Sequence, residues 1–156
     1  MKASILRIGA VIAIIAITLP TSADANAPAG QYVVAAGGNV NGTVYDTKTK
    51  LTWQQTALST KYTWASAKTY CAGVGTSLGG TGWRLPTIKE LMTIVDYSQA
   101  TGPMIDPNAF PGTPSAIFWS SSPSIESSTH AVVVNFSNGY IVEYVFSTLL
   151  AVRCVR

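Results

Sequence analysis

Four lysine side chains are the strongest candidates for ligand chemistry in this sequence. Lys48 and Lys50 lie in one predicted turn, while Lys61 and Lys68 are seven residues apart along a predicted helix. If the fold brings the two pairs together, they would form a small cationic patch for sulfate or carboxylate groups. The alternative is that all four are ordinary solvated lysines.

Catalytic and metal-binding patterns are weak. His130 is the only histidine, and no serine lies in the nucleophile-elbow pattern that a serine hydrolase of that type would show. The acidic residues are scattered, and Asp106-Pro107-Asn108 lacks the spacing of a calcium loop, so Asp106 is expected to start a turn. We expect no enzymatic activity, no cofactor and no dedicated metal site, with an incidental calcium ion as the open alternative.

The two cysteines, Cys71 and Cys154, are an even number in a chain that is expected to be exported. An oxidising compartment favours their pairing, and the alternative is two buried thiols. A bridge between them would close a loop of about 84 residues, for which the chain-entropy model gives roughly 4.6 kcal/mol of stabilisation.

The N-terminus has the pattern of a secretory signal peptide. Lys2 and Arg7 precede an apolar run over 8–19, and Ala23-Asp24-Ala25 is a small-x-small cleavage site. The apolar run is shorter than the roughly 20 residues of a membrane span, which makes an uncleaved anchor the weaker interpretation. The sequence therefore predicts a signal peptide over 1–25 and no transmembrane anchor in the mature chain. The protein is expected in the periplasm, at the cell surface or secreted.

The composition of the remainder fits one small domain. Removal of 1–25 leaves 131 residues with eight basic and six acidic side chains, a net charge of +2. This charge is too mild for a nucleic-acid-binding protein, which would normally show a concentrated basic stripe. We expect a leader with a first strand over 26–41 and one domain over 42–156.

The first half of the mature chain alternates between strand and helix patterns. Strands are expected at 31–36, 43–46 and 51–55, with turns at 37–39 and 46–50. A helix is expected over 63–72 with Thr63 as its N-cap, followed by a glycine-rich loop over 73–82. A second helix should begin after Thr87, which forms a capping box with Glu90, and should end near Tyr97.

The pattern of the last third predicts strands. They are expected at 117–120, 130–136, 140–146 and 149–155, after an irregular connection over 98–115. Asn138-Gly139 is a strong signal for a hairpin turn between the second and third of these strands. The tryptophans Trp53, Trp64, Trp83 and Trp119 could stack on sugars, but their patterned positions favour burial.

Several motifs occur together and in order. They are Val44-Tyr45-Asp46, Leu51-Thr52-Trp53-Gln54, Thr63-Trp64 with Ala67 and Cys71, Gly82-Trp83-Arg84-Leu85-Pro86-Thr87 with Glu90-Leu91, Phe118-Trp119-Ser120-Ser121 and Val152-Arg153-Cys154-Val155-Arg156. This pattern resembles the bacterial domain family typified by the C-terminal domain of the Legionella collagen-like adhesin. The resemblance covers about 42–156.

The resemblance implies an α+β, C-type-lectin-like fold, with two helices packed on a small, twisted, mostly antiparallel sheet. It also implies a disulfide from the first helix to the last strand, which Cys71 and Cys154 match. Phe118-Trp119 is followed by only about ten residues before the next predicted strand, and this stretch contains neither the acidic-Pro-Asn nor the Gln-Pro-Asp tripeptide of calcium-dependent lectins. A collagen-like tract is also absent. The stretch 83–87 is also similar to formylglycine-generating enzymes, but the two cysteines occupy the positions of a structural bridge, which argues against an oxidase.

Some members of the resembled family are adhesins that bind sulfated glycosaminoglycans. We therefore expect a secreted or surface-exposed binding module for a sulfated or acidic glycan, or for a protein partner. The alternative is a structural or assembly component of an envelope or extracellular complex. A cationic or aromatic cluster at the surface would favour the first function, and a broad apolar patch the second. The oligomeric state is left open by the sequence.

Overall fold

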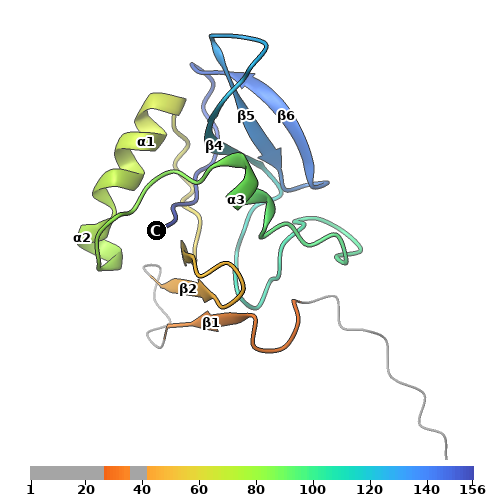
Figure 1. Ribbon diagram of the computed structural model, residues 1–156. Helices are drawn as coiled ribbons and strands as arrows, with labels where there is room; N and C mark the ends of the chain where they lie inside the picture. The colour runs from red at the N-terminus through yellow and green to blue at the C-terminus, as the bar shows by residue number, and fades with distance from the viewer. Residues whose placement is uncertain (1–26, 36–41) are drawn as a thin grey trace, which may run out of the picture.

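The structure of the chain is a computed structural model that describes residues 27–35 and 42–156 (Figure 1). The predicted signal peptide over 1–25 and the predicted turn at 37–39 lie outside the described residues. No helix in the described part of the chain is long and apolar enough to cross a membrane. The described residues form two small antiparallel sheets and three short helices.

The first sheet is formed by β1 (Tyr32–Val34), β2 (Thr43–Asp46) and β3 (Thr52–Gln54), which pair in that order. The buried carboxylate of Asp46 holds the β2–β3 turn, because its oxygens accept hydrogen bonds from the Lys48 amide (2.9 Å) and the Thr49 hydroxyl (2.8 Å). The hairpin predicted from 43 to 55 is confirmed.

Two of the helices have the predicted N-termini. In α1 (Trp64–Gly73), the Thr63 hydroxyl accepts a hydrogen bond from the Ser66 amide. In α3 (Ile88–Met92), the capping box of Thr87 and Glu90 is complete. Both satisfy backbone amides that a helix N-terminus leaves without partners. Both helices pack against the second sheet, α1 on β4 and α3 on β4 and β5.

Two helix predictions were wrong. The glycine-rich segment expected to be a loop contains one helical turn, α2 (Gly75–Leu78). Helix α3 ends at Met92 and does not continue to Tyr97. The Thr93 amide and hydroxyl both donate to the Glu90 carbonyl, and the Asp96 amide donates to Met104 (3.0 Å), which lies outside the helix. The helical hydrogen bonds therefore stop at Met92, although the apolar sequence pattern continues beyond it.

The second sheet is formed by β4 (Ile117–Pro123), β5 (His130–Asn135) and β6 (Tyr140–Val145), again in chain order. The predicted turn at Asn138-Gly139 joins β5 to β6. Gly139 has a φ of 77°, a conformation that is costly for residues with a Cβ, and its amide donates to the Asn135 carbonyl (2.7 Å).

The segment expected as a continuous closing strand over 149–155 is instead a run of isolated bridges. Leu150 pairs with Tyr62, Ala151 with Phe118, and Val155 with both Trp53 and Arg84. The segment passes from one sheet to the other, so it cannot stay paired with either. Its bridges to Trp53 in β3 and to Phe118 in β4 tie the two sheets together.

The second sheet separates two hydrophobic clusters. One contains Phe118 and Val134, and the other contains Trp119 and Val133, all with 0% exposure. Successive residues of a strand point to opposite faces, so β4 and β5 are buried on both sides. The fold is thus two cores with a sheet between them.

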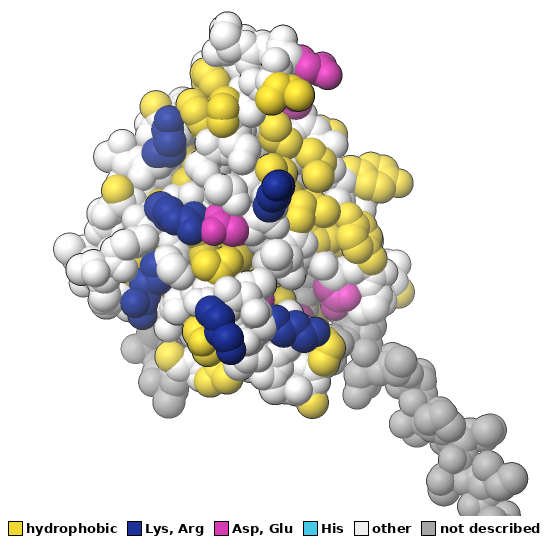
Figure 2. Space-filling view, in the orientation of Figure 1, with side chains coloured by type: hydrophobic (Ala, Val, Ile, Leu, Met, Phe, Trp, Pro, Cys, Tyr) yellow, Lys and Arg dark blue, Asp and Glu magenta, His cyan; other side chains and the backbone are white. Residues whose placement is uncertain are grey.

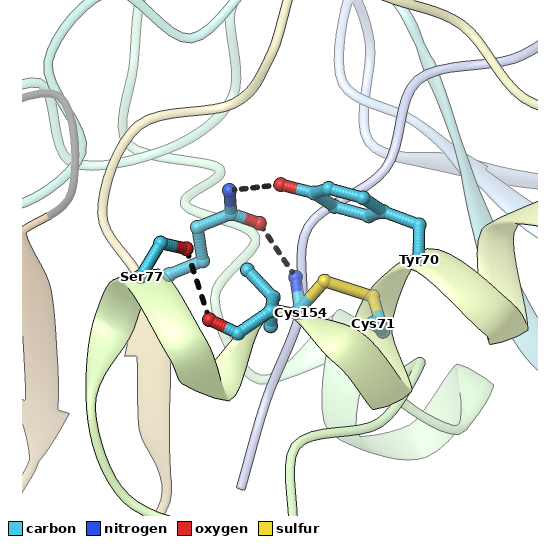
Figure 3. The surroundings of a disulfide bond; sticks show 6 residues. Tyr70, Cys71, Ser77 and Cys154 are labelled. Carbon is cyan, nitrogen blue, oxygen red and sulfur yellow. Dashed lines mark hydrogen bonds between the residues drawn. A yellow bond between two sulfur atoms is a disulfide. The ribbon is translucent and has the colours of Figure 1, made fainter.

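The disulfide between Cys71 and Cys154 joins α1 to the closing segment, with a Cα–Cα distance of 5.3 Å (Figure 3). Beside it, the Gln54 side chain donates to the Tyr70 hydroxyl (3.0 Å) and accepts from the Cys154 amide (3.2 Å). Helix, first sheet and closing segment therefore meet at one buried point. The α+β class is confirmed, whereas the C-type-lectin-like topology stays a prediction.

Candidate functional site

Basic side chains gather on the face that carries α3, the β2–β3 turn and the C-terminus (Figure 2). We define this basic face by the exposed residues Lys48, Lys50, Arg84, Lys89 and Arg156. The face combines segments that are far apart in the sequence, so it exists only in the folded chain.

The closing segment assembles the basic face. The Thr52 amide donates to the Arg156 carbonyl and the Arg156 amide to the Thr52 carbonyl, both at 2.9 Å. The Arg84 amide donates to the Val155 carbonyl, also at 2.9 Å. The last two residues therefore lie between the hairpin that carries Lys50 and the segment that carries Arg84. Sequence reasoning missed Arg84, Lys89 and Arg156, because nothing local indicates that the last residue pairs with β3.

The other two predicted lysines contact other parts of the chain. Lys68 sits 3.5 Å from the ring centroid of Trp64, which stacks on Phe146 at 4.2 Å. Lys61 lines a hollow of about 340 Å³ together with Leu150 and other residues. Among the described residues, no contact joins Lys61 or Lys68 to the β2–β3 turn. The site of four lysines stays a prediction, and the structure supports Lys48 and Lys50 as members of one face.

The acidic residues are partly withdrawn from the surface. Asp46 has 0% exposure and is engaged in its turn. Asp106 has 6% exposure, and its carboxylate accepts hydrogen bonds from the amides of Asn108, Ala109 and Ala27. Asp106 does start a turn, as expected. The two buried carboxylates leave the surface more positive than the net charge suggests, and in the described chain no three potential metal ligands cluster.

One ion pair lies within the basic face. Arg84 donates two hydrogen bonds to the Glu90 carboxylate, at 2.7 and 2.6 Å, and Glu90 also accepts from the Thr87 amide (2.8 Å). The hydrogen bonds from Arg84 make the largest contribution to lowering the pKa of Glu90 to about 2, and those from Thr87 contribute less. Burial opposes this change. Arg84 is therefore partly neutralised, and Lys48, Lys50, Lys89 and Arg156 carry the available positive charge.

This ion pair predicts a specific pH dependence. A carboxyl whose pKa is lowered by folding stabilises the protein above its unfolded pKa, near 4.5, and loses that contribution as the pH falls toward about 2. We expect Glu90→Gln, which keeps the capping box, to lower the free energy of unfolding by about 1 kcal/mol at pH 7, after allowance for solvent screening. The difference from wild type should shrink between pH 4.5 and pH 2 in denaturant melts.

Glu126→Gln, on the exposed loop between β4 and β5, is the charge-matched control for that experiment. A stability difference for Glu90→Gln that is the same at pH 7 and at pH 2.5, within about 0.3 kcal/mol, would contradict the ionic role of the pair.

A hollow of about 310 Å³ lies beside Arg156, and half of its lining residues are glycines. A Cβ on Gly75 would come within 2.7 Å of the Gly80 carbonyl oxygen, and a Cβ on Gly80 within 2.8 Å of an Arg156 nitrogen. The Arg156 guanidinium also lies 5.5 Å from the ring centroid of Trp83, which lines the same hollow. The hollow therefore has a backbone surface, one aromatic wall and a cation at its edge.

His130 does contact a serine, but within a single turn. Its Nδ1 lies 2.7 Å from the Ser127 hydroxyl and 3.0 Å from that of Thr129. None of these partners is a carboxylate, and all three residues belong to the connection between β4 and β5 or to the start of β5. The contacts order this loop, and they do not reproduce a catalytic triad.

The tryptophans are largely internal, as their pattern predicts. Trp53 and Trp119 have 0% exposure and Trp83 has 5%. Trp64 is half-buried, and its ring system contacts both Phe146 and Lys68. Charge, and not exposed aromatic surface, therefore distinguishes the candidate site.

A family model described as the Lcl C-terminal domain matches residues 42–156. No curated protein matches the chain. The matched range contains the basic face, the disulfide and both sheets except β1, which the structure adds by pairing it with β2.

Proposed function

The chain belongs to the Lcl C-terminal domain family, and from this premise we propose that it is the binding module of an exported protein and recognises an anionic glycan through its basic face. The adhesin-related family and the disulfide indicate an extracellular or surface protein. The observation that carries the glycan proposal is that the β2–β3 turn with Lys48 and Lys50 shares one face with Arg156, whose guanidinium borders the hollow (Figure 2).

The chemistry of this face suits sulfated or carboxylated sugars. Arginine and lysine donors bind such groups by charge-assisted hydrogen bonds, which are stronger than neutral ones. The hollow, at about 310 Å³, is at the low end of the range for small-molecule sites and leaves room for part of a sugar chain. Its backbone donors and acceptors are the kind of groups that contact hydroxyls.

Binding of this type should depend on salt and not on a metal ion. Exposed charges are screened over about 8 Å at physiological ionic strength, so an interaction built on three or four cations weakens steeply as salt rises. No described cluster of ligands suggests a calcium-mediated sugar site. Affinity should therefore survive chelation by EDTA.

The test is retention of the disulfide-bonded protein on immobilised heparin during a salt gradient, with and without EDTA. We expect the wild type to be retained at low salt and the triple variant Lys48→Gln, Lys50→Gln, Arg156→Gln to elute at much lower salt. Exposed basic residues contribute little to stability, so the melting temperature of the variant should change little.

A matched control is the double variant Lys61→Gln, Lys68→Gln, which removes two exposed lysines that are not among the five residues defining the basic face. It should elute close to the wild type. Larger loss for the control than for the triple variant would place the site at Lys61 and Lys68 instead. Passage of the wild type straight through the column at low salt would reject the anionic-glycan proposal and favour a protein ligand.

A structural or assembly role is the second candidate function, and it is favoured by a different observation. Exposed apolar side chains cover strand β6, including Tyr140 at 65% and Ile141 at 50% exposure. Contiguous apolar surface on an exported domain is typical of contacts with other proteins. Both functions are compatible, because β6 and the basic face are built from different residues.

A further inference from the structure

The two arginines of the basic face differ in what their guanidinium groups bind. Arg84 gives its planar fork to the Glu90 carboxylate, with hydrogen bonds of 2.7 and 2.6 Å. Arg156 is exposed, and within the described part of the chain its guanidinium makes neither a hydrogen bond nor an ion pair. The N–H donors of Arg156 are therefore available to a ligand.

The Arg156 guanidinium is nevertheless held in place. The backbone of Arg156 makes two hydrogen bonds with Thr52, both at 2.9 Å. The guanidinium lies against Gly80, where a Cβ would come within 2.8 Å of one of its nitrogens, and it lies 5.5 Å from the ring centroid of Trp83. The indole is fixed in turn, because its Nε1 donates to the Gly79 carbonyl (2.8 Å). A side chain confined in this way loses less conformational freedom when it binds a ligand.

The hollow of about 310 Å³ beside this guanidinium has a wall of glycine backbone. Gly80 and Gly82 have φ values of 76° and 80°, which favour glycine, and a Cβ on Gly75 would come within 2.7 Å of the Gly80 carbonyl oxygen. The exposed Thr81 also lines the hollow, and its hydroxyl has no hydrogen-bond partner among the residues that the structure describes. The hollow therefore offers space for a ring, with polar groups that suit ring hydroxyls.

This arrangement favours a carboxylate that is bonded directly to a sugar ring. The arginine fork matches the two oxygens of a carboxylate, as the contact between Arg84 and Glu90 shows on the same face. In a uronate the carboxylate is attached to a ring carbon, so contact with Arg156 brings the ring to the hollow. A sulfate ester has an additional linking oxygen, which places the ring farther from the guanidinium.

We propose that the basic face recognises a uronate, whose carboxylate is bound by Arg156 and whose ring occupies the hollow beside Gly80 and Trp83. This inference rests on the proposed function, since it names the class of acidic sugar that the same face takes. Its distinguishing feature is selectivity for a carboxylate over a sulfate, which binding driven by charge alone would not produce.

The test is calorimetric titration of the disulfide-bonded protein with trigalacturonate at low salt. The methyl ester of trigalacturonate, which has lost its charge, and low-mass dextran sulfate, which has sulfates but no carboxylate, are the ligand controls. We expect the wild type to bind trigalacturonate and not its ester. Arg156→Lys keeps the charge and removes the fork, so it should weaken trigalacturonate binding about tenfold and dextran sulfate binding by a smaller factor.

A pair of glycine variants tests the position of the guanidinium. Gly80→Ala would place a methyl group against the Arg156 guanidinium and displace it. Gly79→Ala is the matched control, because its φ of 75° is nearly that of Gly80, at 76°, while a Cβ there would meet nothing within 4 Å. The two variants should lower the melting temperature by similar amounts, and only Gly80→Ala should weaken trigalacturonate binding severalfold.

The outcomes separate this inference from the proposed function. A wild type that is retained on heparin but does not bind trigalacturonate would overturn the uronate proposal and leave the anionic-glycan proposal standing. Equal binding of the acid and its ester, or equal losses for Arg156→Lys with trigalacturonate and dextran sulfate, would also overturn it. A wild type that binds neither heparin nor trigalacturonate would reject both proposals.

Discussion

Replacement of both Cys71 and Cys154 by alanine is expected to lower the free energy of unfolding by about 4 kcal/mol. The bridge spans 83 positions in the sequence, and a cross-link over a long loop restricts the unfolded chain strongly. Both residues have 0% exposure, so the substitution also removes buried sulfur atoms from the second core cluster.

Denaturant melts of the wild type, the double variant and the reduced wild type measure this effect. Ser77→Ala is the local control, because Ser77 lies next to the bridge (Figure 3) but bonds only to the carbonyl of Val74. It should cost less than about 1 kcal/mol. A loss of under about 1 kcal/mol for the double variant would show that the bridge contributes little to stability.

Arg153→Ala is expected to destabilise the fold by about 3–5 kcal/mol, by emptying a buried site and leaving its acceptors without donors. Arg153 has 0% exposure, and its guanidinium donates to the carbonyls of Gln54 and Gln55 and to the Thr113 hydroxyl. It also lies 4.7 Å from the ring centroid of Phe110. Burial lowers the pKa of Arg153 to about 9, so the group remains charged at neutral pH.

Arg153→Met separates the two contributions. Methionine fills most of the volume and removes both the buried charge and the Nε atom, which has no hydrogen-bond partner among the described residues. We expect it to cost roughly half as much as alanine, because the cavity is then largely filled and the remaining cost is that of the unsatisfied acceptors, the Gln54 and Gln55 carbonyls and the Thr113 hydroxyl. Lys61→Met, at an exposed position, is the control and should stay within about 0.5 kcal/mol. An Arg153→Ala variant as stable as the wild type in urea melts would contradict this account.

Both changes affect the closing segment. Arg153 and Cys154 anchor the closing segment to β3 and α1. The next two residues are Val155 and Arg156, and Arg156 lies on the basic face. The disulfide and the buried arginine therefore bear on the proposed function as well as on stability.

The local sequence by itself determined the hairpins, the helix starts and the internal position of the tryptophans. Asn138-Gly139, the Thr87–Glu90 capping box and the N-cap Thr63 each act over a few residues, so a short pattern contains the physical cause. The pairing of the two cysteines followed from their even number and the expected compartment. Lys48 and Lys50 were placed together because one turn contains both.

The tertiary structure alone decided where α3 ends, how the closing segment runs and which cations share a face. The end of α3 depends on a hydrogen bond from Asp96 to Met104, and the closing segment on alternating partners in two sheets. Nothing in Val152-Arg153-Cys154 distinguishes a buried arginine from an exposed one until the Gln54 and Gln55 carbonyls surround it. Contacts between residues a hundred positions apart depend on the packing of the whole chain, and for that reason Arg156 joined Lys50 only in the folded protein.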